Sequence, residues 1–143
     1  MRRLAILSLI IGFIGVIALF GLSFKARSEQ RVPVITDVSW LAEDLDGGGV
    51  IDFAQTTLMI DHDNNVSGSG GCNRFMSKAT FRGLKLTFTP AAATRKLCPP
   101  ALMNQENKFF AVLEQTRSFL VVDGKLTLRG TAGKTIARLA RQN

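Results

Sequence analysis

Gly68-Ser69-Gly70-Gly71-Cys72-Asn73-Arg74-Phe75 is the stretch of this 143-residue chain that says most about its fold. Glycine has no side chain to obstruct a positive φ or the close approach of another segment, so three glycines before a cysteine predict a tight, crowded corner. A phosphate-binding loop is the alternative, but the stretch lacks a G-K-[ST] ending and no helical pattern follows it. We therefore interpret it as a corner of the fold.

An apolar block precedes the rest of the chain. Residues Leu4–Leu22 carry no charge and follow Arg2 and Arg3, which is the order of a secretory signal. As a helix this block would measure about 28 Å, close to the hydrocarbon thickness of a bilayer. We expect residues 1–28 to be a signal-anchor in the inner membrane with the domain in the periplasm. The alternative is a cleaved signal peptide, with the domain secreted to the periplasm.

Residues 29–37 are polar, contain a proline and predict a linker, so the domain is expected to occupy residues 38–143. That length suits one domain with a core of its own and is too short for a multi-domain enzyme. The net charge of +7 is concentrated at the apolar block, which four basic residues flank. No long basic run follows, so nucleic-acid binding is not expected.

The remaining charges are segregated along the sequence. Residues 29–65 hold eight acidic residues and one basic residue, whereas residues 66–143 hold three acidic and thirteen basic residues. Strands from the two segments would interleave in a β-fold, so we expect the opposite charges to pair within the domain.

Cys72 and Cys98 are the only cysteines. In an exported domain, two cysteines at this separation predict one disulfide. A zinc site would need two further ligands, and His62 is the only histidine. The spacing is also not that of a C-x-x-C redox pair. We expect no metal and no cofactor.

Short strand-like runs separated by turn residues predict a mainly β domain. The clearest hairpin signals are Asp123-Gly124 and the run Asp63-Asn64-Asn65, because these residues tolerate positive φ. Alternating apolar and polar residues indicate strands with one buried face. Together with the strand that opens the domain at Val38, the runs Thr57–Asp61, Val66–Ser69, Lys78–Phe81, Leu84–Phe88, Phe119–Val122, Lys125–Leu128 and Lys134–Arg141 predict seven or eight antiparallel strands.

One segment has helical spacing instead. Pro99 and Pro100 open Ala101–Thr116, and proline suits the first turn of a helix because that N–H has no intrahelical partner. The sequence therefore predicts an α+β fold: a small, partly open antiparallel β-barrel that curls round a single α-helix.

Two segments of the chain resemble the signature of the META domain, the family of HslJ-like heat-shock envelope proteins. The first is the glycine-rich stretch, and the second is Pro90–Cys98, which resembles the family's T-R/K-x-x-C segment. Further motifs fall in the family's order over Val38–Leu139. The matching positions are Gly68, Gly70, Gly71, Cys72, Asn73, Arg74, Phe75, Thr94, Arg95 and Cys98.

The resemblance implies a role rather than a reaction. It implies links to heat shock, antibiotic tolerance and, in other relatives, secretion or virulence, and no such relative is firmly established as an enzyme. The best-known bacterial relatives are lipoproteins with an N-terminal cysteine. This chain lacks that cysteine, so residues 4–22 are expected to anchor it instead.

Glu106 lies within the apolar stripe of the expected helix. A carboxylate buried there needs a cation or hydrogen-bond donors, since unpaired burial is costly. One interpretation is that the helix rotates and Glu106 reaches the rim. The sharper one is an ion pair with Arg74 or Arg95, because these arginines flank the two cysteines.

The sequence contains little that indicates a catalytic site. His62 lies in a predicted turn, and no oriented serine, histidine and acid set can be argued around Ser67 or Ser69. A calcium loop beginning at Asp61 would lack its glycine and glutamate. We expect a monomeric, non-enzymatic envelope protein, active in stress response or antibiotic tolerance, that binds a protein partner or a hydrophobic ligand. The alternatives are a lipid-holding or pilotin-like secretion accessory and, after these, a hydrolase.

Overall fold

A computed structural model describes residues 32–142. The predicted signal segment, residues 1–28, and the start of the predicted linker lie outside the described residues. Within residues 32–142, no helix combines the length and apolar character needed to cross a membrane.

The described chain forms one antiparallel sheet and a single α-helix, α1 (Pro100–Gln115). The fold is mostly β, as the sequence predicts. The strands are β1 (Val38–Leu45), β2 (Gly48–Gly49), β3 (Thr57–Ile60), β4 (Asn65–Ser69), β5 (Arg74–Arg82), β6 (Lys85–Phe88), β7 (Ala92–Ala93), β8 (Ser118–Val122), β9 (Lys125–Arg129) and β10 (Thr135–Arg141), with a short 3-10 turn, η1 (Thr131–Gly133).

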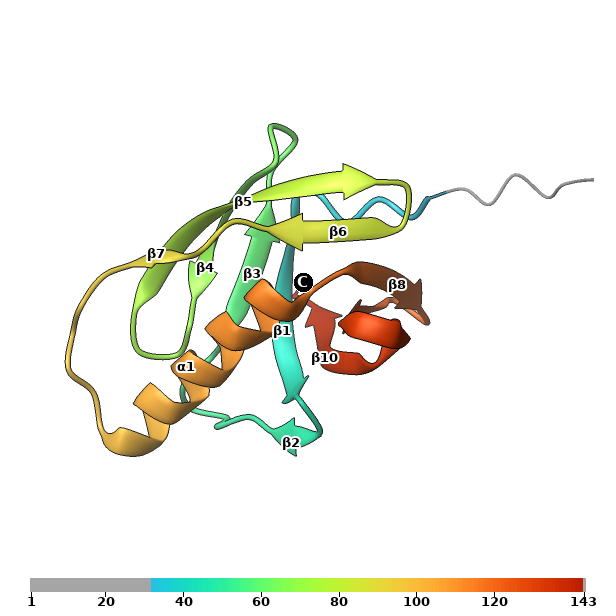
Figure 1. Cartoon of the computed structure of the whole chain (residues 1–143). Helices are drawn as coiled ribbons and strands as arrows, with labels where there is room; N and C mark the ends of the chain where they lie inside the picture. Colours follow the sequence, from blue (N-terminus) through green and yellow to red (C-terminus); the bar gives the residue numbers. More distant parts are fainter. Residues whose placement is uncertain (1–31, 143) are drawn as a thin grey trace, which may run out of the picture. The chain divides into compact units, whose positions relative to one another are not determined.

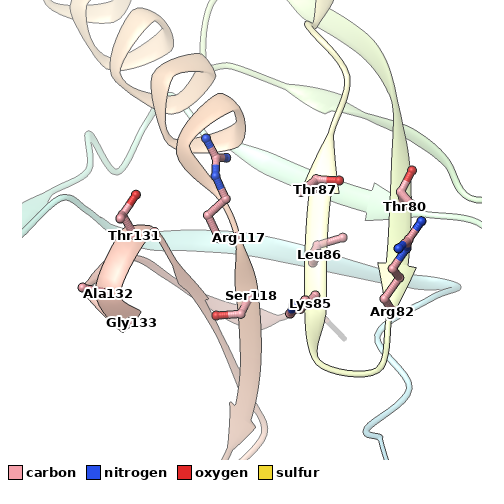
Figure 2. A pocket seen from close by; sticks show the side chains of 11 residues that line it. Thr80, Arg82, Lys85, Leu86, Thr87, Arg117, Ser118, Thr131, Ala132 and Gly133 are labelled. Atoms are coloured by element: carbon pink, nitrogen blue, oxygen red, sulfur yellow. The ribbon is translucent and has the colours of Figure 1, made fainter.

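The sheet curls into a partly closed ring. Its strand order is β10-β9-β8-β6-β5-β4-β3-β1-β2, and β10 also pairs with β1 along most of its length. The weak joint is between β6 and β8, which share one residue pair, Lys85 with Ser118. Figure 1 shows α1 beside this ring of strands. At the weak joint β6 and β8 draw apart (Figure 2).

The local signals place most elements correctly. The helix begins at Pro100, one residue from the predicted start, with Pro99 as its N-cap. Both hairpin turns form, and Asn64 and Asp123 take positive φ there. β5 starts at Arg74 rather than near Lys78, because the residues after Cys72 pair directly with β4.

The glycine run that follows β1 is part turn and part strand. Asp46 and Gly47 take the positive φ angles of a tight turn, with φ of 52° and 78°. Gly48 and Gly49 then pair with Leu45 and Asp44 of β1. Two turn residues are enough to reverse the chain, so the last two glycines can join the ladder.

The space between the ring and α1 is filled by side chains. Phe109, Leu86 and Leu126 are fully buried, and Phe75 meets Phe109 edge to face at 5.5 Å. The packed region also reaches back into the segment expected to be a linker, because Ile35 is buried and its carbonyl accepts a hydrogen bond from Trp40 Nε1. The interior is therefore a packed core.

The β3–β4 turn gives the first prediction. Asp61 accepts hydrogen bonds from the backbone N–H groups of Asp63 and Asn65 and from Asn65 Nδ2. The bond from the Asn65 side chain is the first cause that lowers the pKa of the Asp61 carboxyl. We expect Asn65→Ala to raise the pKa of Asp61 towards its ordinary value of 3.8, as measured by NMR titration of the side-chain carboxyl carbon.

The sign of the stability effect follows from the same shift. The pKa of Asp61 is lower in the folded state than in the unfolded chain, so the ionised carboxylate stabilises the fold. This stabilisation is fully present at a pH above the ordinary pKa of 3.8, and it is lost as the pH falls through the lower pKa of the folded state. The Asn65→Ala chain should lose less stability on acidification than the parent chain. An unchanged Asp61 titration midpoint in Asn65→Ala would contradict this account.

Candidate functional site

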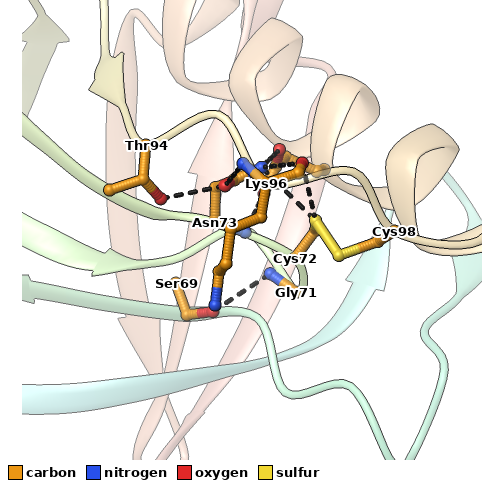
Figure 3. Close-up of a disulfide and its surroundings, with 8 residues drawn as sticks. Ser69, Gly71, Cys72, Asn73, Thr94, Lys96 and Cys98 are labelled. Carbon is orange, nitrogen blue, oxygen red and sulfur yellow. Dashed lines mark hydrogen bonds between the residues drawn. A yellow bond between two sulfur atoms is a disulfide. The ribbon is translucent and has the colours of Figure 1, made fainter.

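The glycine-rich corner is held together by the side chain of Asn73, which is 2% exposed. Its Nδ2 donates to Glu106 Oε1 at 2.8 Å, and its backbone N–H donates to Glu106 Oε2 at 2.5 Å. Its Oδ1 accepts from Thr94 Oγ1 and from the backbone N–H of Lys96. Its carbonyl accepts from the N–H of Gly70. One residue thus ties the β4–β5 corner, the β7–α1 loop and the helix together. Figure 3 shows its hydrogen bonds to Thr94 and Lys96 beside the disulfide.

Glu106 is buried, at 4% exposure, so the interpretation in which it reaches the rim is wrong. The predicted ion pair with Arg74 or Arg95 is wrong: in residues 32–142, no arginine nitrogen lies within 4.0 Å of the Glu106 carboxylate. Both arginines are exposed. The carboxylate instead receives the two N–H donors of Asn73, which satisfy it without burying a cation.

The neighbouring residue on the helix, Gln105, holds a second loop. Its Oε1 accepts from the N–H of Ile51 at 2.7 Å, and its Nε2 donates to the carbonyl of Ala54 and to Thr56 Oγ1. Thr56 in turn donates to the carbonyl of Gly70. Gln105 was not among the residues predicted from the sequence, although a second polar residue inside an apolar stripe is the same signal that marked Glu106.

The cysteine pair closes the corner from the outside. Cys72 and Cys98 form a disulfide with their Cα atoms 6.0 Å apart, as predicted. It joins the residue before Asn73 to the residue that precedes the Pro99 N-cap of α1. The β7–α1 loop is therefore fixed at both ends, by Thr94 at its start and by Cys98 at its end.

All three motif glycines are required by this geometry. A Cβ on Gly68 would lie 2.0 Å from the backbone oxygen of Thr57 in β3. A Cβ on Gly70 would lie 2.6 Å from Glu106 Cγ, well inside van der Waals contact. Gly71 takes a φ of +109°, which side-chain-bearing residues rarely adopt. The corner is therefore crowded, as the glycine pattern predicts, against β3 at Gly68 and against the helix at Gly70.

The motif residues divide into two groups. Phe75 and Asn73 are buried, and the hydroxyl group of Thr94 donates a hydrogen bond to Asn73 Oδ1. Arg74 and Arg95 are exposed and belong to no ion pair within residues 32–142. Most of the motif thus builds the corner, and its two arginines are presented to the outside.

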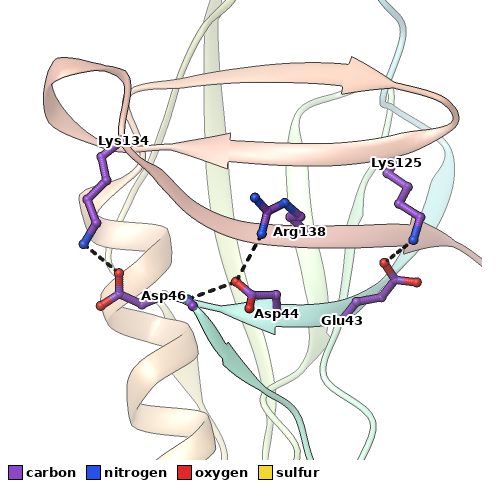
Figure 4. Close-up of polar contacts among 7 residues, drawn as sticks. Glu43, Asp44, Asp46, Lys125, Lys134 and Arg138 are labelled. Atoms are coloured by element: carbon purple, nitrogen blue, oxygen red, sulfur yellow. Dashed lines mark hydrogen bonds and ion pairs between the residues drawn. The ribbon is translucent and has the colours of Figure 1, made fainter.

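The segregated charges pair across the sheet as expected (Figure 4). β1 supplies the carboxylates of Glu43 and Asp44, which meet Lys125 at 2.7 Å and Arg138 at 4.0 Å. In the following turn Asp46 meets Lys134 at 2.9 Å, and this hydrogen bond, with the charge of Lys134, lowers the pKa of Asp46. All three pairs lie at the surface and contribute little stability.

A groove of about 710 Å³ lies at the weak joint between β6 and β8. Arg82, Lys85 and Arg117 bring positive charge to it, and no acidic side chain lines it. The other lining residues are small, hydroxylated or apolar: Thr80, Leu86, Thr87, Ser118, Gly130, Thr131, Ala132 and Gly133. Figure 2 shows that this lining comes from β5, β6, β8, η1 and the short connection between α1 and β8, which carries Arg117.

The groove could not be found from local sequence signals, because its lining comes from strands far apart in the chain. Its volume lies in the range of small-molecule sites. Cations and hydroxyl groups without acids suit the recognition of an anionic group.

His62 lies on the β3–β4 turn with a side chain 77% exposed, near the carboxylates of Asp37 and Asp63. Its ring nitrogens lie 3.7 Å and 3.5 Å from these two groups. This is the solvated turn histidine that the sequence indicates. In residues 32–142, no group of three or more metal-ligating side chains is gathered.

The partly closed, mostly β ring with one helix and a motif-built corner defines the class of this domain. The family model of the META domain matches residues 33–143, and the chain belongs to this family. No curated protein matches the chain.

Two solved structures share the fold. One NMR structure has 24% sequence identity and a TM-score of 0.59, covering 74% of this chain and 90% of its own. An NMR structure of a protein from Burkholderia xenovorans has 23% identity and a TM-score of 0.62, covering 76% of this chain and 84% of its own. At these identities the likeness shows the fold alone.

The Asn73–Glu106 contact gives a stability prediction. In Glu106→Gln the new amide keeps one acceptor but turns N–H donors towards Asn73, so a buried donor loses its partner. We expect a loss of about 1–3 kcal/mol in the free energy of unfolding, measured by urea titration with the disulfide intact. The control Glu114→Gln, exposed on the same helix, should change it by less than about 0.5 kcal/mol. Equal effects would refute the role of Glu106.

The crowding at Gly70 gives another prediction. Gly70→Ala forces the Glu106 side chain to move, because the new Cβ would lie 2.7 Å from Oε2. We expect a cost of about 1–3 kcal/mol, from overpacking and from weakened bonds to Asn73. Gly49→Ala is the matched control, since nothing lies within 4 Å of its new Cβ. If both alanines are tolerated equally in thermal unfolding, the close approach is not what selects glycine at position 70.

Proposed function

We propose that this META-domain chain is a non-enzymatic binding protein of the cell envelope that acts in envelope stress or antibiotic tolerance, and that it binds its ligand in the groove between β6 and β8. The observation that carries the proposal is the groove itself, a cavity at the one joint where the ring is held by a single residue pair. The envelope location rests on the apolar block of the sequence and on the disulfide.

The packed core favours a ligand on the ring rather than inside it. Leu58, Leu86 and Phe109 have no exposed surface, so an acyl chain would have to displace them to enter the ring. The groove needs no such rearrangement. We therefore place a lipid-like or other amphipathic ligand along the groove, as a variant of the hydrophobic-ligand hypothesis.

The lining indicates the chemistry of that ligand. Arg82, Lys85 and Arg117 can pair with a carboxylate or phosphate, while their aliphatic stems and the small residues of η1 offer apolar contact. Arg117 Nη1 already donates to the carbonyls of Glu114 and Thr116, which holds this side chain in place at the end of the helix. An alkyl chain with an anionic head fits these features.

A second candidate is a partner segment that adds as a strand, as a secretion accessory would require. It is favoured by the single residue pair between β6 and β8, which leaves the rest of β6 without a strand partner on that side. An extended segment could pair with such an edge through its main chain. The experiment below separates the two candidates.

The test uses the full chain in its membrane and a diazirine-labelled alkyl phosphate as the probe. We expect photolabelled peptides to contain β6 and β8, and labelling to fall about tenfold or more in Arg82→Gln/Lys85→Gln, which removes two charge-assisted contacts. Lys125→Gln is the control, because Lys125 is exposed and paired with Glu43 on another part of the sheet.

The outcomes distinguish the candidates. Labelling that does not concentrate on the groove, or that survives the double substitution, contradicts the ligand proposal. Cross-links from a photoreactive residue at position 87 to a protein, without any alkyl phosphate labelling, would favour the strand-addition candidate.

A further inference from the structure

A second surface, away from the groove, combines positive charge with exposed apolar side chains. We define the β7 surface by Arg74, Met76, Arg95, Lys96 and Leu97. Leu97 is 96% exposed and Met76 is 68% exposed, and both are among the large apolar side chains that the described residues leave in solvent. The three basic residues are exposed as well.

Hydrogen bonds and strand pairing place these five residues side by side. Met76 lies opposite Ala92 in the β5–β7 pair, and the N–H of Thr94 donates to the carbonyl of Arg74. Arg95, Lys96 and Leu97 follow Thr94 directly. Two hollows, one lined by Met76 and one by Leu97, share Ala92, Ala93 and Thr94 as a common wall.

Leu97 is held in its exposed position. The backbone of the residue before it is fixed because Lys96 N–H donates to Asn73 Oδ1 and its carbonyl accepts from Asn73 Nδ2. The residue after it is Cys98, in the disulfide. The backbone is thus fixed on both sides of Leu97, and the loop presents this apolar side chain to water at 96% exposure.

The charge of this surface is uncompensated. Asp63 and Glu106 are consecutive acidic residues in the sequence, so none occurs between them, whereas six basic residues do. Glu106 lines the hollow beside Leu97, but it is 4% exposed and both of its carboxylate oxygens accept hydrogen bonds from Asn73. Within residues 32–142, no salt bridge involves Arg74, Arg95 or Lys96.

We propose that the β7 surface docks on the surface of a bilayer that contains anionic phospholipids. Arg74, Arg95 and Lys96 pair with lipid phosphates, while Leu97 and Met76 enter the boundary between headgroups and acyl chains. Basic residues beside protruding apolar ones are the chemistry of proteins that lie on membranes. An acidic protein would satisfy the three cations but would need a ready-made pocket for Leu97, whereas lipid chains yield to it.

The chain length permits this contact. Residues 23–31 join the apolar block to the described domain, and nine residues span at most about 30 Å. With the block in the bilayer, the domain is confined to the region where the membrane surface lies. Docking then requires only that the tethered domain rotate towards the bilayer, because the domain does not have to diffuse to the bilayer from solution.

The test measures whether position 97 enters lipid. The full chain carrying Leu97→Trp is reconstituted into nanodiscs of phosphatidylcholine with 30% phosphatidylglycerol, with bromine atoms on the acyl chains as quenchers. The native Trp40 is 1% exposed and gives a constant background. We expect the fluorescence of the indole introduced at position 97 to be quenched and shifted to the blue. Val122→Trp is the control, because Val122 is 55% exposed on the β8–β9 hairpin, outside the β7 surface.

Charge variants test the electrostatic part. Lys96→Gln should lower the ratio of docked to undocked domain about fivefold, and Arg74→Gln/Arg95→Gln/Lys96→Gln about a hundredfold. Lys108→Gln, an exposed base on α1, should leave it unchanged. Omitting phosphatidylglycerol or raising the salt concentration should reduce quenching in the same way.

Two results would overturn the proposal. The first is quenching in the Leu97→Trp chain that is no greater than quenching in the Val122→Trp chain in anionic nanodiscs. The second is a blue shift in the Leu97→Trp chain that requires a soluble polyanion, such as polyphosphate, and does not occur with lipid alone. Because neither the probe position nor the charge variants touch the groove between β6 and β8, failure here leaves the proposed function standing, and the reverse also holds.

Discussion

The hydrogen bonds between Asn73 and the buried carboxylate of Glu106 are the constraint on which the rest of this domain depends. They join the only α-helix of the described residues to the corner where β4 passes into β5. A buried carboxylate is tolerated only if donors meet it, and both donors come from a single residue at a fixed place in the chain. The helix therefore has one register against the sheet, and the glycines beside it leave room for that register.

The same corner separates the structural part of the family motif from its exposed part. The side chain of Asn73 and the Cys72–Cys98 disulfide both hold the β7–α1 loop in place, so these motif residues have a structural role. What the loop then presents is Arg95 and Leu97, beside Arg74 from β5. A rigid loop that exposes charge and apolar surface together loses little entropy on binding, which suits a binding protein better than a flexible loop would.

The curled sheet brings together opposite charges that are segregated along the sequence. The acidic N-terminal part of the domain and the basic remainder meet where β1 pairs with β10. Glu43, Asp44 and Asp46 lie near Lys125 of β9, Arg138 of β10 and Lys134 just before β10. The basic residues of β5, β6 and the β7–α1 loop lie away from that pairing and keep their charge. Within residues 32–142, the ion pairs thus gather around β1, whereas the basic residues of the groove and of the β7 surface belong to no ion pair.

Local physical chemistry was enough to predict the strands, the hairpin turns, the proline-opened helix and the cysteine pair, because each depends on residues close in sequence or on a count of thiols. It also placed Glu106 in the apolar stripe of the helix, with the rim and a buried ion pair as the two interpretations. The predicted partner, an arginine, was wrong. A cation is the usual partner of a buried carboxylate, and no local signal indicates that the side chain of Asn73 points inward. The partner of Glu106, the polar role of Gln105 and the groove between β6 and β8 were decided by tertiary structure. Each depends on which distant segments the closing ring brings together, and that is set by the packing of the whole core.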